Sequence, residues 1–247
     1  MLIIKDLLKC YSTKTEPALG GINLKFAPGE IIGLFGENGS GKTTLFNCVL
    51  GNVSYKGEIA VDEEAITYKN IAKIAYGSSS NTFLGQLTLS EHKDFYALNF
   101  PLFNEARFNL LVDFLSLPMK EKIKNLSQGQ KNQVETVLAL SQGATYILLD
   151  EPFANNDIFK REDFYKVLLG MLQPEECLIL SSHLIDEMKN FVSRVVLLKK
   201  GKLIADKITA ELDQEGKELV TWMKELYGYE DRVAKFIEKA ERIQDEK

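Results

Sequence analysis

The sequence contains few cysteines and no long hydrophobic run. Its three cysteines, Cys10, Cys48 and Cys177, are odd in number and far apart in the chain. Neither a disulfide framework nor a zinc-binding spacing is therefore expected. No apolar run reaches the length of about 18 residues that a membrane-spanning helix needs, and Asp6 introduces an acidic side chain too early for a signal peptide. We expect a cytoplasmic chain in a reducing compartment, with any membrane role supplied by a partner.

The sequence also lacks an excess of positive charge. It has 30 Lys and Arg against 35 Asp and Glu, which gives a net charge of −5. This balance argues against a broad nucleic-acid surface, which is usually basic. Internal repeats, low-complexity tracts and sustained coiled-coil heptads are absent too. With 247 residues and 45% hydrophobic content, the chain can bury a sizeable core in one large or two small domains.

A glycine-rich stretch between two apolar segments is the most informative feature that is present. Residues 30–35 form a short apolar run that predicts a buried strand, and residues 45–50 predict a helix that stops at Gly51. The residues around the turn between them are Gly36, Glu37, Asn38, Gly39, Ser40, Gly41, Lys42, Thr43 and Thr44. A strand, a glycine-rich loop and a helix in this order are typical of a P-loop, the Walker A motif.

The residue types in this loop suit a nucleotide phosphate. The glycines allow a tight turn that points successive N–H groups at one spot, where the helix N-terminus adds partial positive charge. Lys42 can reach phosphate oxygens, and Thr43 offers a hydroxyl to Mg²⁺. The alternative is a glycine-rich turn without a ligand, but this eight-residue pattern arises by chance in roughly one chain in a hundred of this length. The loop therefore predicts binding of ATP with Mg²⁺.

Two later strands end in polar side chains that extend this prediction. Residues 146–149 predict a buried parallel strand followed by Asp150 and Glu151, and residues 178–182 predict another followed by His183. Ligands of α/β sheets bind at the carboxyl ends of such strands. We expect Asp150 to hold Mg²⁺ directly or through water, Glu151 to activate water and His183 to contact a γ-phosphate. The alternatives are a helix cap or solvated turn for the acids and a structural role for the histidine.

Two further features have both a structural and a functional interpretation. Ser127 with Gln130 three residues later is a capping-box pattern, so a helix begins there. That helix N-terminus could also face an anion. Tyr11 is either an edge aromatic of an antiparallel sheet or a platform for a purine ring, because aromatic rings stack on bases of any sequence.

The remaining chain divides into an ATPase domain and a tail. We expect the domain to cover residues 1–206, with an inserted helical subdomain at about 88–125 that is broken at Pro101 and Pro118. Residues 207–247 predict a mostly helical tail. One amphipathic face of the tail follows the cap candidate Asp231 and comprises Val233, Phe236, Ile237 and Ala240.

Taken together, the motifs resemble those of ATP-binding-cassette (ABC) ATPase subunits, over about Leu2 to Asp206. The matching features are the Walker A stretch, a signature from Leu126 to Gln130, a Walker B strand ending at Asp150, and Glu151 and His183. The resemblance implies a P-loop NTPase core of α/β class with an antiparallel β subdomain and the helical insertion. It also implies that Tyr11 stacks on adenine. In a head-to-tail dimer, Ser127, Gly129 and Gln130 of one chain would then face the ATP bound to the other.

Three motifs depart from the family pattern. Ser78 and Ser79 stand where the family usually has a glutamine that contacts Mg²⁺ and the attacking water. Asn155 and Asn156 replace the usual middle of the D-loop, which spans residues 154–157, and Gln128 replaces the commoner glycine in the signature. The sequence therefore predicts ATP binding more firmly than it predicts the rate of hydrolysis.

Three functions compete at this point. The first is an energy-coupling subunit, exporter-like, that pairs with a second cassette and a separate membrane permease, with Phe83 and Leu84 exposed for docking. It would lie at the inner face of the membrane and bind no nucleic acid directly. The second is a soluble ABC ATPase acting on protein or nucleic-acid assemblies. The third is a weakly hydrolysing regulatory cassette, suggested by the missing glutamine but disfavoured by Glu151 and His183.

Overall fold

The computed structural model describes residues 1–12, 16–78, 83–152, 158–183 and 188–228, and for residues 158–162 the backbone alone. Within this part, six strands form one mostly parallel sheet in the order β10-β9-β3-β8-β7-β6. These strands are β3 (Ile31–Phe35), β6 (Ile74–Ser78), β7 (Tyr146–Asp150), β8 (Cys177–Ser182), β9 (Arg194–Lys199) and β10 (Lys202–Ile208). Strands β9 and β10 pair as an antiparallel hairpin, and the other pairs are parallel. Strands β7 and β8 are buried along their whole length, as parallel strands covered on both faces must be.

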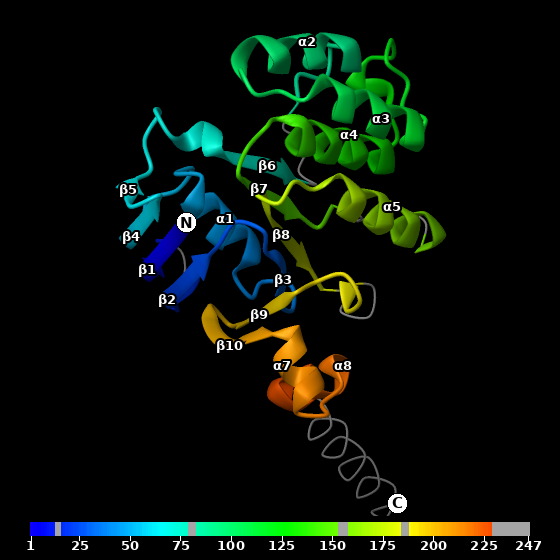
Figure 1. The fold of residues 1–247 in the computed structure, drawn as a ribbon. Coiled ribbons are helices and arrows are strands. Elements are labelled where there is room, and N and C mark those ends of the chain that lie inside the picture. The colour runs from blue at the N-terminus through cyan, green and yellow to red at the C-terminus, as the bar shows by residue number, and fades with distance from the viewer. Residues whose placement is uncertain (13–15, 79–82, 153–157, 184–187, 229–247) are drawn as a thin grey trace, which may run out of the picture.

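A second sheet is antiparallel and carries the N-terminus. In the described residues its order is β2-β1-β4-β5. The strands are β1 (Leu2–Lys9), β2 (Leu19–Phe26), β4 (Lys56–Val61) and β5 (Glu64–Ala65). In β2, buried and exposed residues alternate from Gly21 to Phe26, because one face packs inward while the other meets solvent. This sheet lies beside the P-loop helix α1 (Lys42–Val49) (Figure 1).

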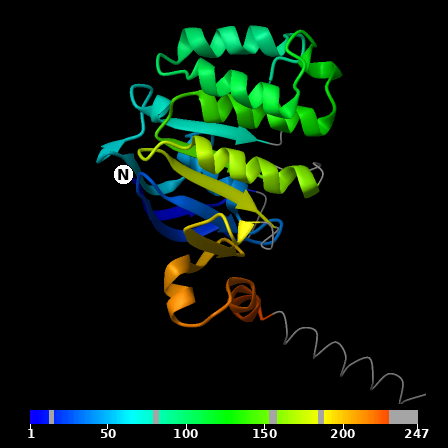
Figure 2. The ribbon, with the colours of Figure 1, turned by 45° about the vertical axis from the view of Figure 1, so that its right-hand side comes forward.

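Helices cover the two faces of the large sheet differently. On one face, α3 (Glu105–Leu115), α4 (Gln128–Ser141) and α5 (Ile158–Met171) share a core with alternate residues of the strands, such as Ile147 and Leu149. On the other face, α1 and the antiparallel sheet share a core with the intervening residues, such as Leu148. Both views show the helical layer on the opposite side of β6 and β7 from α1 (Figures 1 and 2). The large sheet therefore separates α1 from α4.

Helix starts follow the capping chemistry of the sequence. The side chain of Thr88 accepts from the Glu91 N–H and the Glu91 carboxylate accepts from the Thr88 N–H, so α2 (Leu89–Asn99) begins at Leu89. The predicted capping box of Ser127 and Gln130 is confirmed at the start of α4. The breaks expected at Pro101 and Pro118 fall after α2 and after α3.

Some local predictions differ from the structure or lie outside it. Ile71–Lys73 form a 3₁₀ turn, in which the Lys73 N–H bonds to the Asn70 carbonyl at 3.0 Å, so strand β6 begins only at Ile74. A second 3₁₀ turn, Ile123–Asn125, precedes α4. Near the C-terminus, α7 (Thr209–Gln214) and α8 (Leu219–Tyr227) follow β10. The amphipathic face predicted for residues 233–240 lies outside the described residues.

The expected α/β class is confirmed. In the part of the chain that the structure describes, no helix is long and apolar enough to cross a bilayer. The exposure expected for Phe83 is wrong: its ring packs edge-on against His92, with ring centroids 5.0 Å apart, and is half-buried, whereas Leu84 is 67% exposed.

Candidate nucleotide-binding site

The candidate site lies at the carboxyl edge of the large sheet. Strand register aligns Phe35 with Ser182, and Asp150 with both Ser181 and Ser78. Strand ends that are far apart in the sequence therefore meet at one edge, which is where α/β sheets bind ligands.

The loop after β3 is too tightly packed for side chains at two of its glycines. A Cβ at Gly36 would lie 2.2 Å from the Ser40 hydroxyl oxygen and 2.6 Å from the Leu198 carbonyl oxygen. Gly41 has a φ of 112°, and a Cβ there would lie 2.9 Å from the Ala18 carbonyl oxygen. The Gly201 N–H, in the turn between β9 and β10, bonds to the Ser40 carbonyl at 2.9 Å. The loop is thus packed between the antiparallel sheet and the β9–β10 hairpin, and only glycine suits these positions.

Lys42 begins α1 and is only 6% exposed. Its Nζ donates to the Gly36 carbonyl at 2.7 Å, which folds the side chain back over the loop. The same Nζ lies 3.6 Å from Oε1 of Glu151. An ammonium group has three N–H donors, so this arrangement leaves donor capacity for a ligand anion.

Asp150 is the polar centre of the sheet edge. The hydroxyl of Thr43 donates to its Oδ2 at 2.7 Å, and the hydroxyl of Ser181 donates to its Oδ1. The hydroxyl of Tyr76 lies 3.5 Å from Oδ2. These contacts hold the carboxylate, which is 4% exposed, in one orientation.

Glu151 and His183 form a pair beside Lys42. Glu151 has a φ of 48°, and its N–H bonds to the Ser181 hydroxyl oxygen at 3.1 Å. Nδ1 of His183 lies 3.0 Å from both carboxylate oxygens of Glu151. The histidine side chain is 46% exposed and the glutamate side chain 21%, so the pair lies at the mouth of the site.

Two residues of this site were missed at the level of sequence, Ser181 and Tyr76. Ser181 is a hydroxyl inside an otherwise apolar strand, and that position was the available signal. Tyr76 resembles a core aromatic in sequence because it is flanked by small apolar residues. Burial, reinforced by the negative charges of Asp150 and Glu135 and partly offset by a hydrogen bond with Ser78, raises the pKa of Tyr76 to about 12. Its hydroxyl therefore keeps its proton and acts as a donor at neutral pH.

The chemistry of the loop fits a nucleotide. The Ser40 hydroxyl is buried and has no hydrogen-bond partner among the described residues. Such a group costs free energy unless a ligand or water satisfies it. The hydroxyl of Thr43 and the carboxylate of Asp150 offer adjacent oxygen atoms, the ligand type that Mg²⁺ prefers. In the described residues no cluster of three or more His, Cys, Asp or Glu could hold a metal alone.

The other predicted contact residues lie apart from this cluster. Tyr11 follows β1 and is half-buried, with Nζ of Lys9 4.7 Å from its ring centroid. The Lys9 carbonyl accepts from the Ala18 N–H at 2.7 Å, and the Ala18 carbonyl lies next to Gly41. The end of β1, which Tyr11 follows, is therefore connected to the P-loop through Ala18. Ser127 is exposed at the start of α4, on the opposite sheet face from α1.

Two of the departures from the family pattern lie partly or wholly outside the described residues. Ser78 ends β6 and is 3% exposed beside Asp150, whereas Ser79 lies outside the described residues. The D-loop, residues 154–157, also lies outside them.

Cys48 is buried in α1, and burial raises the pKa of its thiol to about 11, so this cysteine is a core residue rather than a reactive group.

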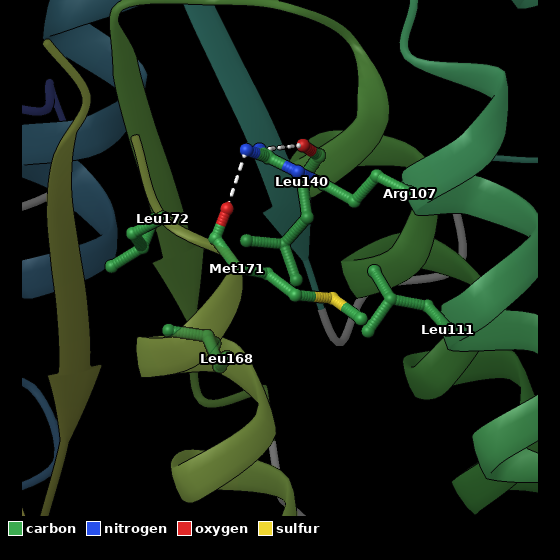
Figure 3. Close-up of a pocket in the computed structure, with 6 residues that line it drawn as sticks. All are labelled: Arg107, Leu111, Leu140, Leu168, Met171 and Leu172. Atoms are coloured by element: carbon green, nitrogen blue, oxygen red, sulfur yellow. Dashed lines mark hydrogen bonds between the residues drawn. The ribbon is translucent and has the colours of Figure 1, made fainter. Parts of the chain in front are cut away.

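A narrow apolar pocket elsewhere is structural. It lies between α3, α4 and α5 and is lined by Arg107, Leu111, Leu140, Leu168, Met171 and Leu172 (Figure 3). The Arg107 guanidinium donates to the Leu140 and Met171 carbonyls, at 2.8 and 2.7 Å, and to both carboxylate oxygens of Glu176, at 2.7 and 3.0 Å. The single charged group of the pocket is thus engaged by the protein itself.

Comparison with known proteins agrees with this geometry. Residues 19–154 match the ABC transporter family model. A relative from Lactococcus lactis, the lacticin-481/lactococcin-DR transport/processing ATP-binding protein, is 32% identical over 222 residues, which cover 83% of this chain and 31% of the relative. The chain belongs to the ABC transporter family and is an ABC-type ATPase cassette by class.

Two solved structures have the same fold. An ATP-binding subunit of an ABC transporter superposes with a TM-score of 0.79 at 22% identity, covering 92% of this chain and 99% of that one. A dimeric ATP-binding cassette in a post-hydrolysis state with ADP and phosphate superposes with a TM-score of 0.74, also at 22% identity, covering 85% of this chain and 99% of that one. The expected ABC ATPase fold is thereby confirmed. The chain spans less than half the length of the first curated relatives that it matches.

Proposed function

We propose that this chain binds Mg-ATP at the P-loop, hydrolyses it, and uses the cycle to drive a membrane transporter through a separate permease. The observation that carries the proposal is the convergence of Lys42, Thr43, Asp150 and Glu151 at one sheet edge. Lys42 is a cation with unused N–H donors, the oxygen atoms of Thr43 and Asp150 suit Mg²⁺, and the Glu151 carboxylate lies at the mouth of the site.

Each residue has a separate task in binding. The N–H groups of the loop and the ammonium of Lys42 take the β- and γ-phosphates, and the ring of Tyr11 stacks on adenine. Thr43 and Asp150 would hold Mg²⁺. When bound, Mg²⁺ neutralises negative charge on the phosphate oxygens. The proton of the Tyr76 hydroxyl and that of the Ser181 hydroxyl help keep Asp150 in position.

Hydrolysis requires a base near the γ-phosphate. Glu151 suits this task, because its carboxylate lies between Lys42 and His183 and is partly open to solvent. It would accept a proton from the attacking water while His183 orients the carboxylate and contacts the γ-phosphate. The Glu151–His183 pair favours real turnover over a purely regulatory cassette, despite the serines at 78 and 79.

The second half of the site comes from another cassette. Helices α1 and α4 pack on opposite faces of one sheet, so the start of α4, with Ser127, Gly129 and Gln130, lies on the other sheet face from its own P-loop helix. In a head-to-tail pair, the N-terminus of one α4 closes over the ATP held by the partner. The dimeric cassette among the structural neighbours supports such pairing.

One experiment separates transport from the alternatives. The tagged chain is co-expressed with membrane proteins of its host, solubilised in detergent and purified, and ATPase activity is measured with and without the co-purified components. A membrane permease that co-purifies and raises the ATPase rate supports peripheral attachment at the inner membrane face. Co-purification of soluble protein or nucleic-acid assemblies alone would overturn the transport assignment and favour a soluble ABC ATPase.

A further inference from the structure

The C-terminal helix α8 ends beside the P-loop. The hydroxyl of its last residue, Tyr227, donates to the Leu198 carbonyl of β9 at 2.7 Å. In return, Nζ of Lys199 donates to the Tyr227 carbonyl at 2.9 Å and lies 5.2 Å from the centroid of its ring. The end of α8 is thus fixed to the end of β9 by two hydrogen bonds and a cation–π contact.

The Leu198 carbonyl, which accepts this hydrogen bond, packs against the P-loop. The register of β3 with β9 ends at Phe35 and Leu197, and the next carbonyl, that of Leu198, lies against the Gly36 turn. Burial raises the pKa of Tyr227, so its hydroxyl keeps its proton and donates to Leu198 at neutral pH. The phenol therefore bonds to a β9 carbonyl that packs against the first turn of the P-loop.

Packing of α8 sets the position of this phenol. Val220 and Met223 are buried at 5% and 0% exposure, and Trp222 packs against the core that α4 and β9 share. Glu218 caps the start of the helix by accepting from the Thr221 N–H. A helix packed and capped in this way places the Tyr227 side chain against the Leu198 carbonyl without a separate ordering cost when nucleotide arrives.

We propose that Tyr227 is a positioning residue for ATP binding, through which the docked helix α8 pre-forms the first turn of the P-loop. This inference rests on the proposed nucleotide site. Because coupling between two sites is reciprocal, ATP that favours the formed loop must also favour the docked helix. The C-terminal segment and the nucleotide thus stabilise one another through a single hydroxyl.

The chain offers a direct test, because Trp222 is its only tryptophan and lies in α8. Affinity for a fluorescent ATP analogue is measured for wild type and Tyr227→Phe, which keeps the ring and removes the hydroxyl. We expect about threefold to tenfold weaker binding, the fold-change of one lost hydrogen bond. Addition of ATP should change the Trp222 fluorescence of wild type, and Tyr227→Phe should reduce that change.

Controls separate this inference from the proposed site. Tyr68→Phe is the matched variant, because Tyr68 is 85% exposed and lies between β5 and β6; it should leave both measurements unchanged. Lys42→Ala should abolish both tight binding and the Trp222 response, and unchanged binding there would overturn the nucleotide site itself. If Lys42→Ala behaves as expected while Tyr227→Phe binds ATP as tightly as wild type, or tighter, the positioning role is wrong. An ATP-independent Trp222 signal in wild type would also overturn the coupling. Thermal unfolding without nucleotide verifies that each variant is folded.

Discussion

Lys42 and Arg107 are both buried cations, each about 6% exposed, but they contact their surroundings in opposite ways. Arg107 donates four hydrogen bonds, two of them to the carboxylate of Glu176. Lys42 donates one to the Gly36 carbonyl, and its acidic neighbour Glu151 lies farther away, at 3.6 Å. Burial alone therefore does not distinguish a structural cation from a ligand-binding one.

The difference lies in which donors the protein itself satisfies. Arg107 bridges the ends of α4 and α5 with α3, so its charge fixes the helical layer. Lys42 keeps donor capacity at a site that also holds the hydroxyl of Ser40, for which the described residues supply no hydrogen-bond partner. A buried charge that the fold only partly satisfies is stabilised when its anion binds. Substitutions at these two cations and their acids should therefore affect different measurements.

The largest effect is expected for Lys42→Ala on nucleotide affinity. Two charge-assisted hydrogen bonds to phosphate, at about 1.5–3 kcal/mol each, would be lost, so ATP binding should weaken by about 3–6 kcal/mol. Equilibrium titration with a fluorescent ATP analogue measures this. The midpoint of urea unfolding without nucleotide should change little. Affinity equal to that of wild type would mean that the loop is only structural.

Glu151→Gln should affect the rate rather than the affinity. Loss of a general base typically lowers the rate by roughly 10²–10⁴-fold, whereas the amide keeps the size of the side chain. Phosphate release measures hydrolysis, and light scattering in ATP measures dimer formation. We expect hydrolysis to stop and a sandwich dimer to accumulate. Hydrolysis at the wild-type rate would refute the assignment of the base.

A second substitution tests the dimer that this variant should trap. Ser127→Arg places a bulky side chain at the N-terminus of α4, where the partner's ATP is expected to sit. Combined with Glu151→Gln, it should return the protein to a monomer in ATP. A Glu151→Gln protein that stops hydrolysing yet stays monomeric would instead point to closure that needs a different cassette or the permease.

Arg107→Met should affect stability and leave nucleotide binding alone. It removes the cation and leaves Glu176 buried without its partner, at a cost of about 3–5 kcal/mol in the free energy of unfolding. Urea unfolding measures the loss. The double variant with Glu176→Gln should recover part of it, because no buried charge then remains unpaired. A change in ATP affinity of the folded variant would contradict the division between the two cations.

Tyr11→Ala should have a smaller effect than the substitutions above. Loss of stacking on adenine would weaken ATP binding by about 1–3 kcal/mol, whereas Tyr11→Phe should be nearly neutral because the ring makes the contact. Titration of both variants with the same ATP analogue compares them. If Phe is as damaging as Ala, the hydroxyl matters and the stacking explanation is wrong.

The sequence by itself determined the features that depend on neighbouring residues. The spacing of Gly36, Gly41 and Lys42 indicates a phosphate loop because turn, donor groups and helix start all lie within one short segment. The capping box of Ser127 and Gln130 indicates a helix start for the same reason. The apolar run before Asp150 indicates a buried strand whose acid lies at the ligand edge.

Only the tertiary structure decided which distant residues meet. Strand order brings β8 between β3 and β7, and that order makes Ser181 the hydroxyl that orients Asp150. Tyr76 reaches the same carboxylate from the edge strand, and Tyr227 of the C-terminal helix reaches the Leu198 carbonyl that packs against the Gly36 turn. None of these contacts has a local pattern, because each is set by how the strands pair and how α8 packs. The P-loop can therefore be predicted from the sequence, whereas the residues that hold it in position are known only from the fold.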